Sequence, residues 1–241
     1  MAKSEAIAPQ NSPLHRGPLT AFDIKIIAAV TMLVDHIGAL FFPEQLIFRV
    51  IGRISFPLFA WLAAQGQAHT QNLLFYLIRL LLLGVISQPI YDQALHLAEP
   101  SYSFQLNILF TLALGVAFIS VLKAARHWWL KAALWILGWV LDVAMLDTAA
   151  PIEGGFWAVT VVWFMSKLRD NAGQSRFWWY GFYVLLSTVL LPSGFAWRTI
   201  PRVLAPLIVF GYSGEQGRKA KWFYGFYPLH FAVLVAIRLM L

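Results

Sequence analysis

Two histidines lie within apolar stretches of this sequence, where an ionisable side chain needs a partner or a task. His36 follows Asp35 in the first long apolar stretch, and His230 lies in the last one. A charged group near the centre of a membrane helix costs about 2.5 to 3.5 kcal/mol. A neutral imidazole, with an unperturbed pKa near 6.5, can act as a general base or accept an acyl group itself. We therefore treat His36 as the main catalytic candidate and His230 as a second one. The simpler alternative is that each only hydrogen-bonds a neighbouring helix.

Two arginines close to the first histidine are further candidates. Arg49 and Arg53 are four residues apart, so they share one face of a helix. Adjacent residues on a helix point about 100° apart, so Asp35 is badly placed to orient His36 directly. We expect Asp35 to pair with Arg49 or Arg53 across the turn that separates them. Arg53, or a backbone donor near a kink at Pro57, could stabilise a developing oxyanion.

Basic side chains within and beside the apolar stretches could hold an anionic ligand. Lys25 precedes His36 by 11 residues, which on a helix returns to within about 20° of the same face, about 16 Å along the axis. A lysine at that position can also simply extend to the membrane surface. The residues that we consider for binding such a ligand are Lys25, Arg49, Arg79, Arg126 and Lys219.

The elements that carry these residues must be membrane helices. The chain has 241 residues, 60% of them hydrophobic and 12% charged, and no cysteine; its mean hydropathy is +0.68. A soluble domain of this size cannot hide that much apolar surface. Stretches of about 20 apolar residues cross a hydrocarbon core as helices. The sequence therefore predicts an all-α, polytopic transmembrane helical bundle of about nine spans, at 22–42, 46–65, 73–91, 104–122, 128–146, 155–165, 177–191, 199–210 and 222–241.

The distribution of charge predicts how the bundle lies in the membrane. Lys and Arg are concentrated in the loops that share a side with the N-terminus, whereas the opposite loops hold mostly Asp and Glu, among them Glu153. This pattern indicates a cytoplasmic N-terminus and an external C-terminus. The polar residues of the spans then fall in the outer half of the membrane and describe one hydrated cavity; they are Asp35, His36, Arg49, Arg53, Asp92, Asn107, Asp142, Arg202 and His230. We favour Asp142 over Asp92 as a cavity residue.

The rest of the chain adds one domain assignment and a set of expected partners. Residues 1–20 are polar and contain proline, and we interpret them as a flexible N-terminal tail before a single transmembrane domain at 21–241. A net charge of +7 would suggest nucleic acid in a soluble protein, but basic loops beside anionic lipid explain it here. We therefore expect membrane lipids as partners, no nucleic acid and no metal.

The segments around these residues resemble the TraX family, whose namesake acetylates the N-terminus of F-type conjugative pilin. The resemblance is carried by Phe22-Asp23-Ile24-Lys25, Asp35-His36-Ile37-Gly38, Arg49-Val50-Ile51-Gly52-Arg53, Ser87-Gln88-Pro89-Ile90-Tyr91 and Tyr227-Pro228-Leu229-His230. The spacing from Lys25 to His36 is also similar to that of a wider superfamily of integral-membrane acyltransferases, in which that histidine is taken as catalytic. Gln65-Gly66 departs from the pattern, because an acidic residue is expected before the glycine.

The resemblance implies an acyltransferase that depends on acetyl-CoA and lies in the bacterial inner membrane. It implies catalytic roles for His36, Asp35, Arg53 and His230, and transfer of an acetyl or similar acyl group from cytoplasmic acyl-CoA to an amine or hydroxyl near the outer face. The acceptor stays open among a protein N-terminus, a sugar and a lipid. The main alternative is a proton- or ion-coupled membrane transporter, since ionisable residues within spans also mark carriers. An inactive structural subunit is a third possibility.

Overall fold

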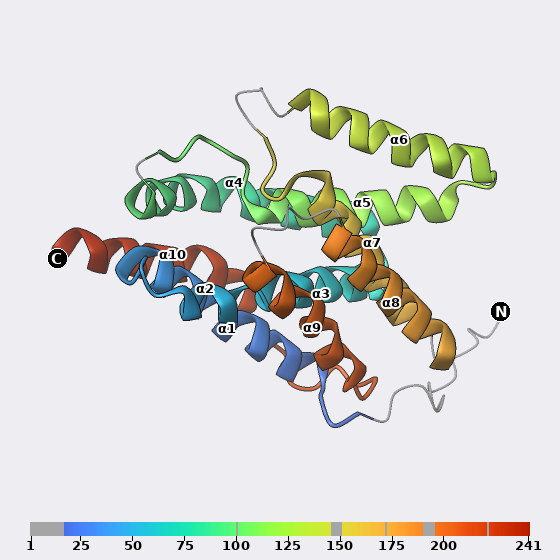
Figure 1. The fold of residues 1–241 in the computed structure, drawn as a ribbon, viewed down its shortest axis with the longest axis horizontal. Coiled ribbons are helices and arrows are strands. Elements are labelled where there is room, and N and C mark those ends of the chain that lie inside the picture. Colours follow the sequence, from blue (N-terminus) through green and yellow to red (C-terminus); the bar gives the residue numbers. More distant parts are fainter. Residues whose placement is uncertain (1–16, 100, 146–150, 172, 190–195, 221) are drawn as a thin grey trace, which may run out of the picture.

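The structure, a computed structural model, describes residues 17–99, 101–145, 151–171, 173–189, 196–220 and 222–241. These residues form α-helices joined by short connections. In chain order the helices are α1 (Ala21–Phe41), α2 (Leu46–Gly52), α3 (Ser55–His69), α4 (Leu73–Ala98), α5 (Ile108–Ala124), α6 (Trp128–Met145), α7 (Gly155–Asp170), α8 (Gly173–Val189), α9 (Ala196–Phe210) and α10 (Phe223–Met240). Figure 1 shows α4, α5 and α6 running along the long axis of the molecule, with α1, α7, α8 and α9 oblique to it. The predicted tail falls largely on residues 1–16, which lie outside the described residues.

The prediction of an all-α bundle is confirmed, but the second predicted span is divided into two helices. α2 ends at Gly52 and α3 begins at Ser55. Pro57 has no N–H to donate to the carbonyl of Arg53, four residues earlier, so the helical ladder is interrupted there. The Ser55 hydroxyl instead donates to the Gly52 carbonyl at 2.7 Å. The sequence predicts a kink at Pro57, and the structure places the interruption one turn earlier, at Arg53 and Ile54, which both keep a right-handed helical backbone.

The boundaries of α4 and α5 also differ from the predicted spans. α4 continues through Pro89 to Ala98, well past the end that hydropathy predicts. α5 begins only at Ile108, because Asn107 caps it. The Asn107 side chain accepts a hydrogen bond from the N–H of Leu109 at 3.1 Å, which satisfies one of the free donors at a helix start.

Among the described residues, five helical segments are long and apolar enough to cross a membrane: Ala21–Phe41, Leu46–His69, Leu73–Ala98, Trp128–Met145 and Phe223–Met240. Ile108–Ala124 and Ile200–Phe210 are apolar but shorter. Large apolar side chains cover the outward face of the bundle; Phe75 and Ile86 on α4 are 71% and 68% exposed. Such a surface requires lipid as its solvent. The chain is therefore an integral membrane protein.

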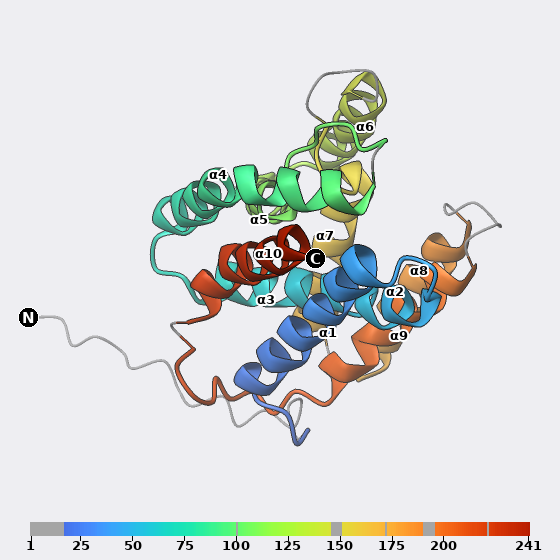
Figure 2. The same ribbon diagram turned by 90° about the vertical axis from the view of Figure 1, so that its left-hand side faces the viewer.

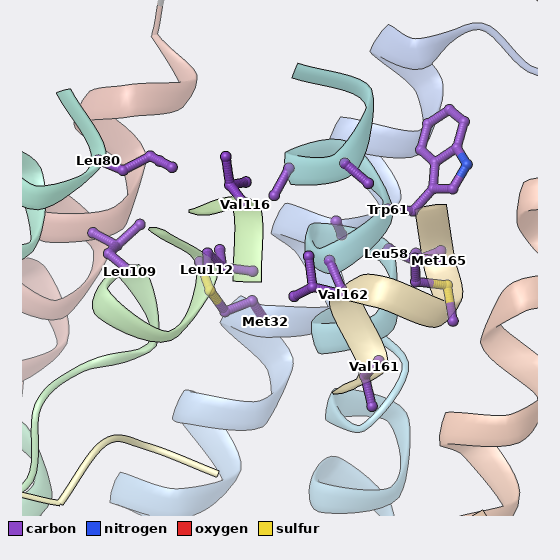
Figure 3. Close-up of a cluster of buried hydrophobic side chains, with 14 of the residues drawn as sticks. Met32, Leu58, Trp61, Leu80, Leu109, Leu112, Val116, Val161, Val162 and Met165 are labelled. Carbon is purple, nitrogen blue, oxygen red and sulfur yellow. The ribbon is translucent and has the colours of Figure 1, made fainter. Parts of the chain in front are cut away.

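The apolar core is centred on α3, which packs between α1, α5 and α7 (Figure 2). Side chains from several helices converge there: Met32, Leu58, Trp61, Leu80, Leu109, Leu112, Val116, Val161, Val162 and Met165 (Figure 3). Ala60 and Ala64 on α3 are fully buried. Small side chains at such positions let neighbouring helix backbones approach closely, which is the main source of packing energy between helices in lipid. This core holds the polar ends of α1, α2 and α3 in fixed positions.

Candidate active site

A polar cavity of about 620 Å³ lies among the ends of α1, α2, α3, α4 and α7. The sequence predicts that Asp35, His36, Arg49, Arg53 and Arg202 share a cavity, and all five line this one. The residues come from α1, α2 and α9 and from the break between α2 and α3. The central prediction, that costly polar side chains from distant parts of the chain meet within the bundle, is confirmed for this set.

The two candidate histidines form a hydrogen-bonded pair. Nδ1 of His36 on α1 lies 2.8 Å from Nε2 of His230 on α10. The other nitrogen of His230, Nδ1, lies 2.9 Å from the backbone carbonyl oxygen of Phe226. The three groups therefore form a chain that starts at a carbonyl and ends at the imidazole of His36.

This chain fixes which nitrogen of His36 can act as a base. The Phe226 carbonyl can only accept, so Nδ1 of His230 must carry the hydrogen. When both rings are neutral, Nε2 of His230 then accepts from Nδ1–H of His36. His36 is left with its lone pair on Nε2. The assignment follows from the hydrogen-bond network, and it makes Nε2 of His36 the atom that can take a proton or an acyl group.

Aromatic rings hold the histidine pair in place. The ring centres of His36 and His230 are 5.0 Å apart with the planes 20° from parallel. Phe231 lies 4.3 Å from His36 and 4.2 Å from His230, measured between ring centres. Phe226 stacks on His230 with 5.1 Å between ring centres. Packing of this kind restricts rotation of both imidazoles, so the tautomer chain has a single geometry.

Asp35 forms the ion pair that the sequence predicts. Nη1 of Arg49 donates to Oδ2 of Asp35 at 2.8 Å and to the Asp35 carbonyl at 3.3 Å. The pair is possible because Gly52 lies against Asp35, where a Cβ would collide with the carboxylate. Asp35 and Arg49 therefore join α1 to α2 and are mainly structural, while His36 is oriented by His230 instead.

Glu153 is an ionisable residue of the cavity that the sequence analysis treats only as a loop charge. Its carboxylate accepts hydrogen bonds from the Tyr91 hydroxyl and the N–H of Ile108. Within the described residues, no donor lies within hydrogen-bond distance of its buried Oε2, a state that costs about 1–3 kcal/mol. Burial raises the pKa of Glu153 to about 6, although those hydrogen bonds and the positive charge of Arg53 act in the opposite direction.

The segment before α7 holds this carboxylate in position. The N–H of Glu153 donates to the Leu106 carbonyl at 2.9 Å, and the Thr111 hydroxyl donates to the Glu153 carbonyl at 2.8 Å. Gly154 and Gly155 follow with φ angles of 75° and 57°. Side chains are strained at such angles. The Gly-Gly pair is the sequence signal that could have drawn attention to Glu153, because it indicates a sharp turn of the chain directly after a carboxylate.

Asp92 and Asn107 belong to a second polar network beside the cavity. The Tyr102 hydroxyl and the Gln88 amide donate to Oδ1 of Asp92 at 2.9 and 3.0 Å. The Asn107 amide donates to Oε1 of Gln88 at 2.8 Å. Tyr102 also lines the cavity. These side chains satisfy one another, so we assign the network to holding the connection between α4 and α5 against the cavity wall.

Asp142 does not line the cavity, which corrects the prediction that it is a cavity residue. Its Oδ1 accepts from the N–H of Phe156 at 2.7 Å and so caps the start of α7. A Cβ on Gly155 would come within 2.7 Å of the same oxygen. A carboxylate at a helix N-terminus is stabilised by the free N–H groups and the helix dipole, and this structural role accounts for Asp142.

Four of the five basic residues considered for an anionic ligand lie outside the cavity lining: Lys25, Arg79, Arg126 and Lys219. Lys25 is half-buried near the start of α1, and Arg126 and Lys219 are exposed. The Arg79 guanidinium lies 4.6 Å from the centre of the Tyr224 ring. The structure therefore brings Arg49 to the histidine pair and leaves the other four at a distance from it. In the described part of the chain, no three His, Cys, Asp or Glu side chains are grouped as metal ligands.

The fold and the cavity define a class of protein, an all-α integral membrane protein in which one member of a histidine pair lines a polar cavity together with arginines. The chain belongs to the TraX family, because the family model described as TraX protein matches residues 22–238. This match confirms the resemblance found in the sequence.

Two curated relatives share part of the sequence. The chain is 34% identical over 117 residues to the probable fimbrial assembly protein FimC, serogroup H1, of Dichelobacter nodosus, covering 44% of this chain and 48% of that protein. It is 30% identical over 129 residues to an uncharacterized protein of Rickettsia prowazekii (strain Madrid E), covering 52% and 48%. The alignments span about half the length of these relatives. No solved structure matches the chain.

Proposed function

We propose that this chain is an integral-membrane acyltransferase that moves an acetyl or similar acyl group from cytoplasmic acyl-CoA to an amine or hydroxyl near the outer face. The observation that carries the proposal is the chain of hydrogen bonds from the Phe226 carbonyl through His230 to His36. It supplies a base at one defined atom, in a cavity that also holds guanidinium groups. Membership of the TraX family supports the same class of reaction.

Two routes use the same atom of His36. In the direct route, the nitrogen or oxygen of the acceptor attacks the thioester carbonyl while Nε2 of His36 takes its proton. The C–S bond breaks, and the imidazolium returns the proton to the departing thiolate. In the covalent route, Nε2 itself attacks, and the acyl-imidazole passes the group to the acceptor. Both routes need the tautomer of His36 that His230 imposes, so the chain of hydrogen bonds from Phe226 to His36 supports either one.

Positive side chains in the cavity suit the negative charge that develops on the carbonyl oxygen. Arg49 is engaged by Asp35 at 2.8 Å. Arg53 lines the same cavity at the break between α2 and α3. We therefore assign stabilisation of the oxyanion to Arg53, and we assign Arg49 to holding Asp35.

The acyl donor would approach from the side of the bundle that carries the basic loops. The 11 residues from Lys25 to His36 span about 16 Å along α1, a distance that a phosphopantetheine arm bridges. We assign Lys25, Arg79, Arg126 and Lys219 to the phosphates of acyl-CoA, on the strength of their charge and of this spacing. The same charge distribution supports an inner-membrane protein with its N-terminus in the cytoplasm. The printed name of the Dichelobacter nodosus relative makes a fimbrial subunit one acceptor to test.

The decisive experiment measures CoA release and acyl transfer by the purified protein in lipid nanodiscs. Labelled acetyl-CoA is supplied with a peptide amine, a methyl glycoside or phosphatidylethanolamine as acceptor. We expect turnover by the wild type and none above the blank for His36→Ala with an unchanged elution profile. His127→Ala, which alters an exposed histidine, is the matched control and should keep the wild-type rate.

Two outcomes would contradict this proposal. Equal turnover by His36→Ala would remove His36 from the mechanism. Failure of the wild type to release CoA with any of the three acceptors, together with ion-driven proton movement in proteoliposomes, would support a transporter instead.

A further inference from the structure

One carboxylate of the cavity has a buried oxygen that the described residues do not satisfy. The Glu153 carboxylate accepts from the Tyr91 hydroxyl and the Ile108 N–H, while Oε2 is buried without a donor among the described residues. Glu153 lines the same cavity as His36 and Arg53. Buried polar atoms in folded proteins nearly always have a hydrogen-bond partner. Oε2 is therefore placed to receive a donor from a molecule in the cavity.

The chain around Glu153 is more constrained than a connection between two helices requires. A Cβ on Gly154 would lie 2.9 Å from the Cβ of Ala158, and one on Gly155 would lie 2.7 Å from Asp142. Both glycines have positive φ angles, so the turn is restricted to glycine by conformation and by space. This local structure fixes the backbone next to Glu153, so the carboxylate can move only by rotation of its own side chain.

A short series of contacts connects Glu153 to the histidine pair. Glu153 accepts from Tyr91, whose ring meets Phe231 edge-on at 5.7 Å between centres. Phe231 in turn lies 4.3 Å from His36. Glu153, Tyr91 and His36 all line the cavity, so the carboxylate and the imidazole share one space.

We propose that Glu153 binds the acyl acceptor, with Oε2 accepting a hydrogen bond from an N–H or O–H group next to the atom that attacks the thioester. A second N–H of an amine and a neighbouring hydroxyl of a polyol both have this chemistry. His36 takes the proton of the attacking atom, so Glu153 orients the acceptor and does not replace the base. The inference rests on the proposed function for the reaction itself, whereas binding at the carboxylate can be tested without turnover.

The first test separates binding of the acceptor from binding of the donor. In Glu153→Gln, the Ile108 N–H still needs an acceptor, so the amide oxygen should face Ile108 and the NH₂ group should face the cavity. The variant then has N–H donors at the position where the acyl acceptor also has a donor, so the two cannot form a hydrogen bond. We expect KM for ethylamine or methyl glucoside to rise about 10- to 100-fold, the weight of one hydrogen bond to a charged group. KM for acetyl-CoA should change by less than about twofold.

The matched control for that test is Glu44→Gln, which removes an exposed carboxylate outside the cavity lining. It should leave KM for both probes unchanged. Elution profile and thermal unfolding of each variant establish that it is folded.

The second test does not depend on turnover or on a variant. A hydrophobic carbodiimide reacts with protonated carboxyl groups in apolar surroundings, and mass spectrometry locates the adduct. At pH 6 we expect labelling of wild-type Glu153 and protection of that residue by ethylamine or methyl glucoside. Labelling of any carboxyl group outside the cavity lining should not respond to either probe. The probe that protects also shows whether the site takes N–H or O–H donors.

The two tests distinguish failure of this inference from failure of the proposed function. Normal turnover with an unchanged KM for both probes in Glu153→Gln overturns the role of Glu153 and leaves acyl transfer standing. Protection of Glu153 by a probe, with no CoA release by the wild type, supports the binding site and overturns acyl transfer. Absence of protection by either probe overturns the binding site.

Discussion

Nδ1 of His36 and Nε2 of His230 lie 2.8 Å apart, although 194 positions separate the two residues in the sequence. One residue is on the first helix and the other is on the last, so the pair exists only when α1 and α10 pack together. The relay ends at a backbone carbonyl of α10. The tautomer of His36 is therefore set by the fold, and not by a neighbouring carboxylate as in a Ser-His-Asp triad.

Replacing His230 by Phe should lower kcat while KM for acetyl-CoA stays within about twofold. Phe fills the space between Phe226 and Phe231 but cannot accept from Nδ1–H of His36. We expect a loss between about tenfold and 10⁴-fold, the range found when a group that orients a functional imidazole is removed. The measurement is kcat as a function of pH.

His230→Gln is the rescue variant, because its amide can donate to the Phe226 carbonyl and accept from His36. It should recover part of the activity lost in His230→Phe. A role in packing alone predicts the reverse order of the two variants, with Phe the more active, and that result would contradict the relay.

Asp35→Asn should lower the free energy of unfolding by about 1–3 kcal/mol, because it leaves the Arg49 guanidinium partly buried without its counter-charge. The side chains of the pair are 27% and 13% exposed. Further replacement of Arg49 by Gln should restore part of the loss, since the two residues act as a unit. The measurement is denaturant unfolding in a fixed detergent.

Lys123→Gln is the control for the ion pair. Lys123 lies 3.6 Å from Asp170 in a pair whose side chains are 48% and 38% exposed, and Asp170 keeps its contact with Arg169 in this variant. Removal of Lys123 should cost less than about 1 kcal/mol. Equal losses from Asp35→Asn and Lys123→Gln would show that burial does not strengthen the Asp35 pair.

The parts of the fold that the sequence predicts are those that depend on local composition. Apolar stretches of membrane length predict the helices. Opposite charges on the two sides of one short turn predict the ion pair of Asp35 with Arg49. The break between α2 and α3 is only half predicted. Pro57 predicts an interruption in the backbone hydrogen bonds of the helix. The position of the interruption also depends on how Gly52 packs against Asp35 on the neighbouring helix.

The parts of the site that the sequence does not predict depend on the path of the chain in space. Depth in the membrane places His36 and His230 at one level, but it does not show that their rings meet. The charge of Glu153 is indistinguishable in sequence from that of an ordinary external loop. Its backbone pairs with Leu106, just before α5, and this pairing is what brings the carboxylate to the cavity. Asp142 shows the opposite case, since its sequence context predicts a cavity residue, whereas its carboxylate caps α7.

Arg53→Lys should lower kcat by about tenfold or more with little change in KM for acetyl-CoA, if Arg53 stabilises the oxyanion. The substitution keeps the positive charge and loses the planar set of donors. Arg238→Lys, at the exposed end of α10, is the control for the same chemical change and should have no effect. A kcat for Arg53→Lys equal to that of the wild type would mean that charge alone suffices or that another donor contacts the oxygen.

The raised pKa of Glu153 predicts a specific dependence of stability on pH. Burial raises the pKa from 4.5 to about 6, so the folded protein holds this proton more tightly than the unfolded chain does. As the pH rises from 4.5 to above 6, the unfolded chain ionises first, and the free energy of unfolding should fall by up to about 2 kcal/mol. The charged and titratable groups that act on Glu153 are Arg53, Asp35 and Tyr91. Tyr102 and Tyr227 also interact with its charge.

Glu153→Gln cannot ionise, so its stability relative to the wild type should increase over that pH interval and stay constant below and above it. Thermal unfolding of both proteins between pH 4 and 8 gives the difference, in which the titration of uncoupled groups cancels. Glu44→Gln removes an exposed carboxylate and should track the wild type throughout. A wild type that gains stability relative to Glu153→Gln as the pH rises would mean that the carboxylate is stabilised in its charged form. Its Oε2 would then already have a donor, and the acceptor-binding role of Glu153 would lose its physical basis.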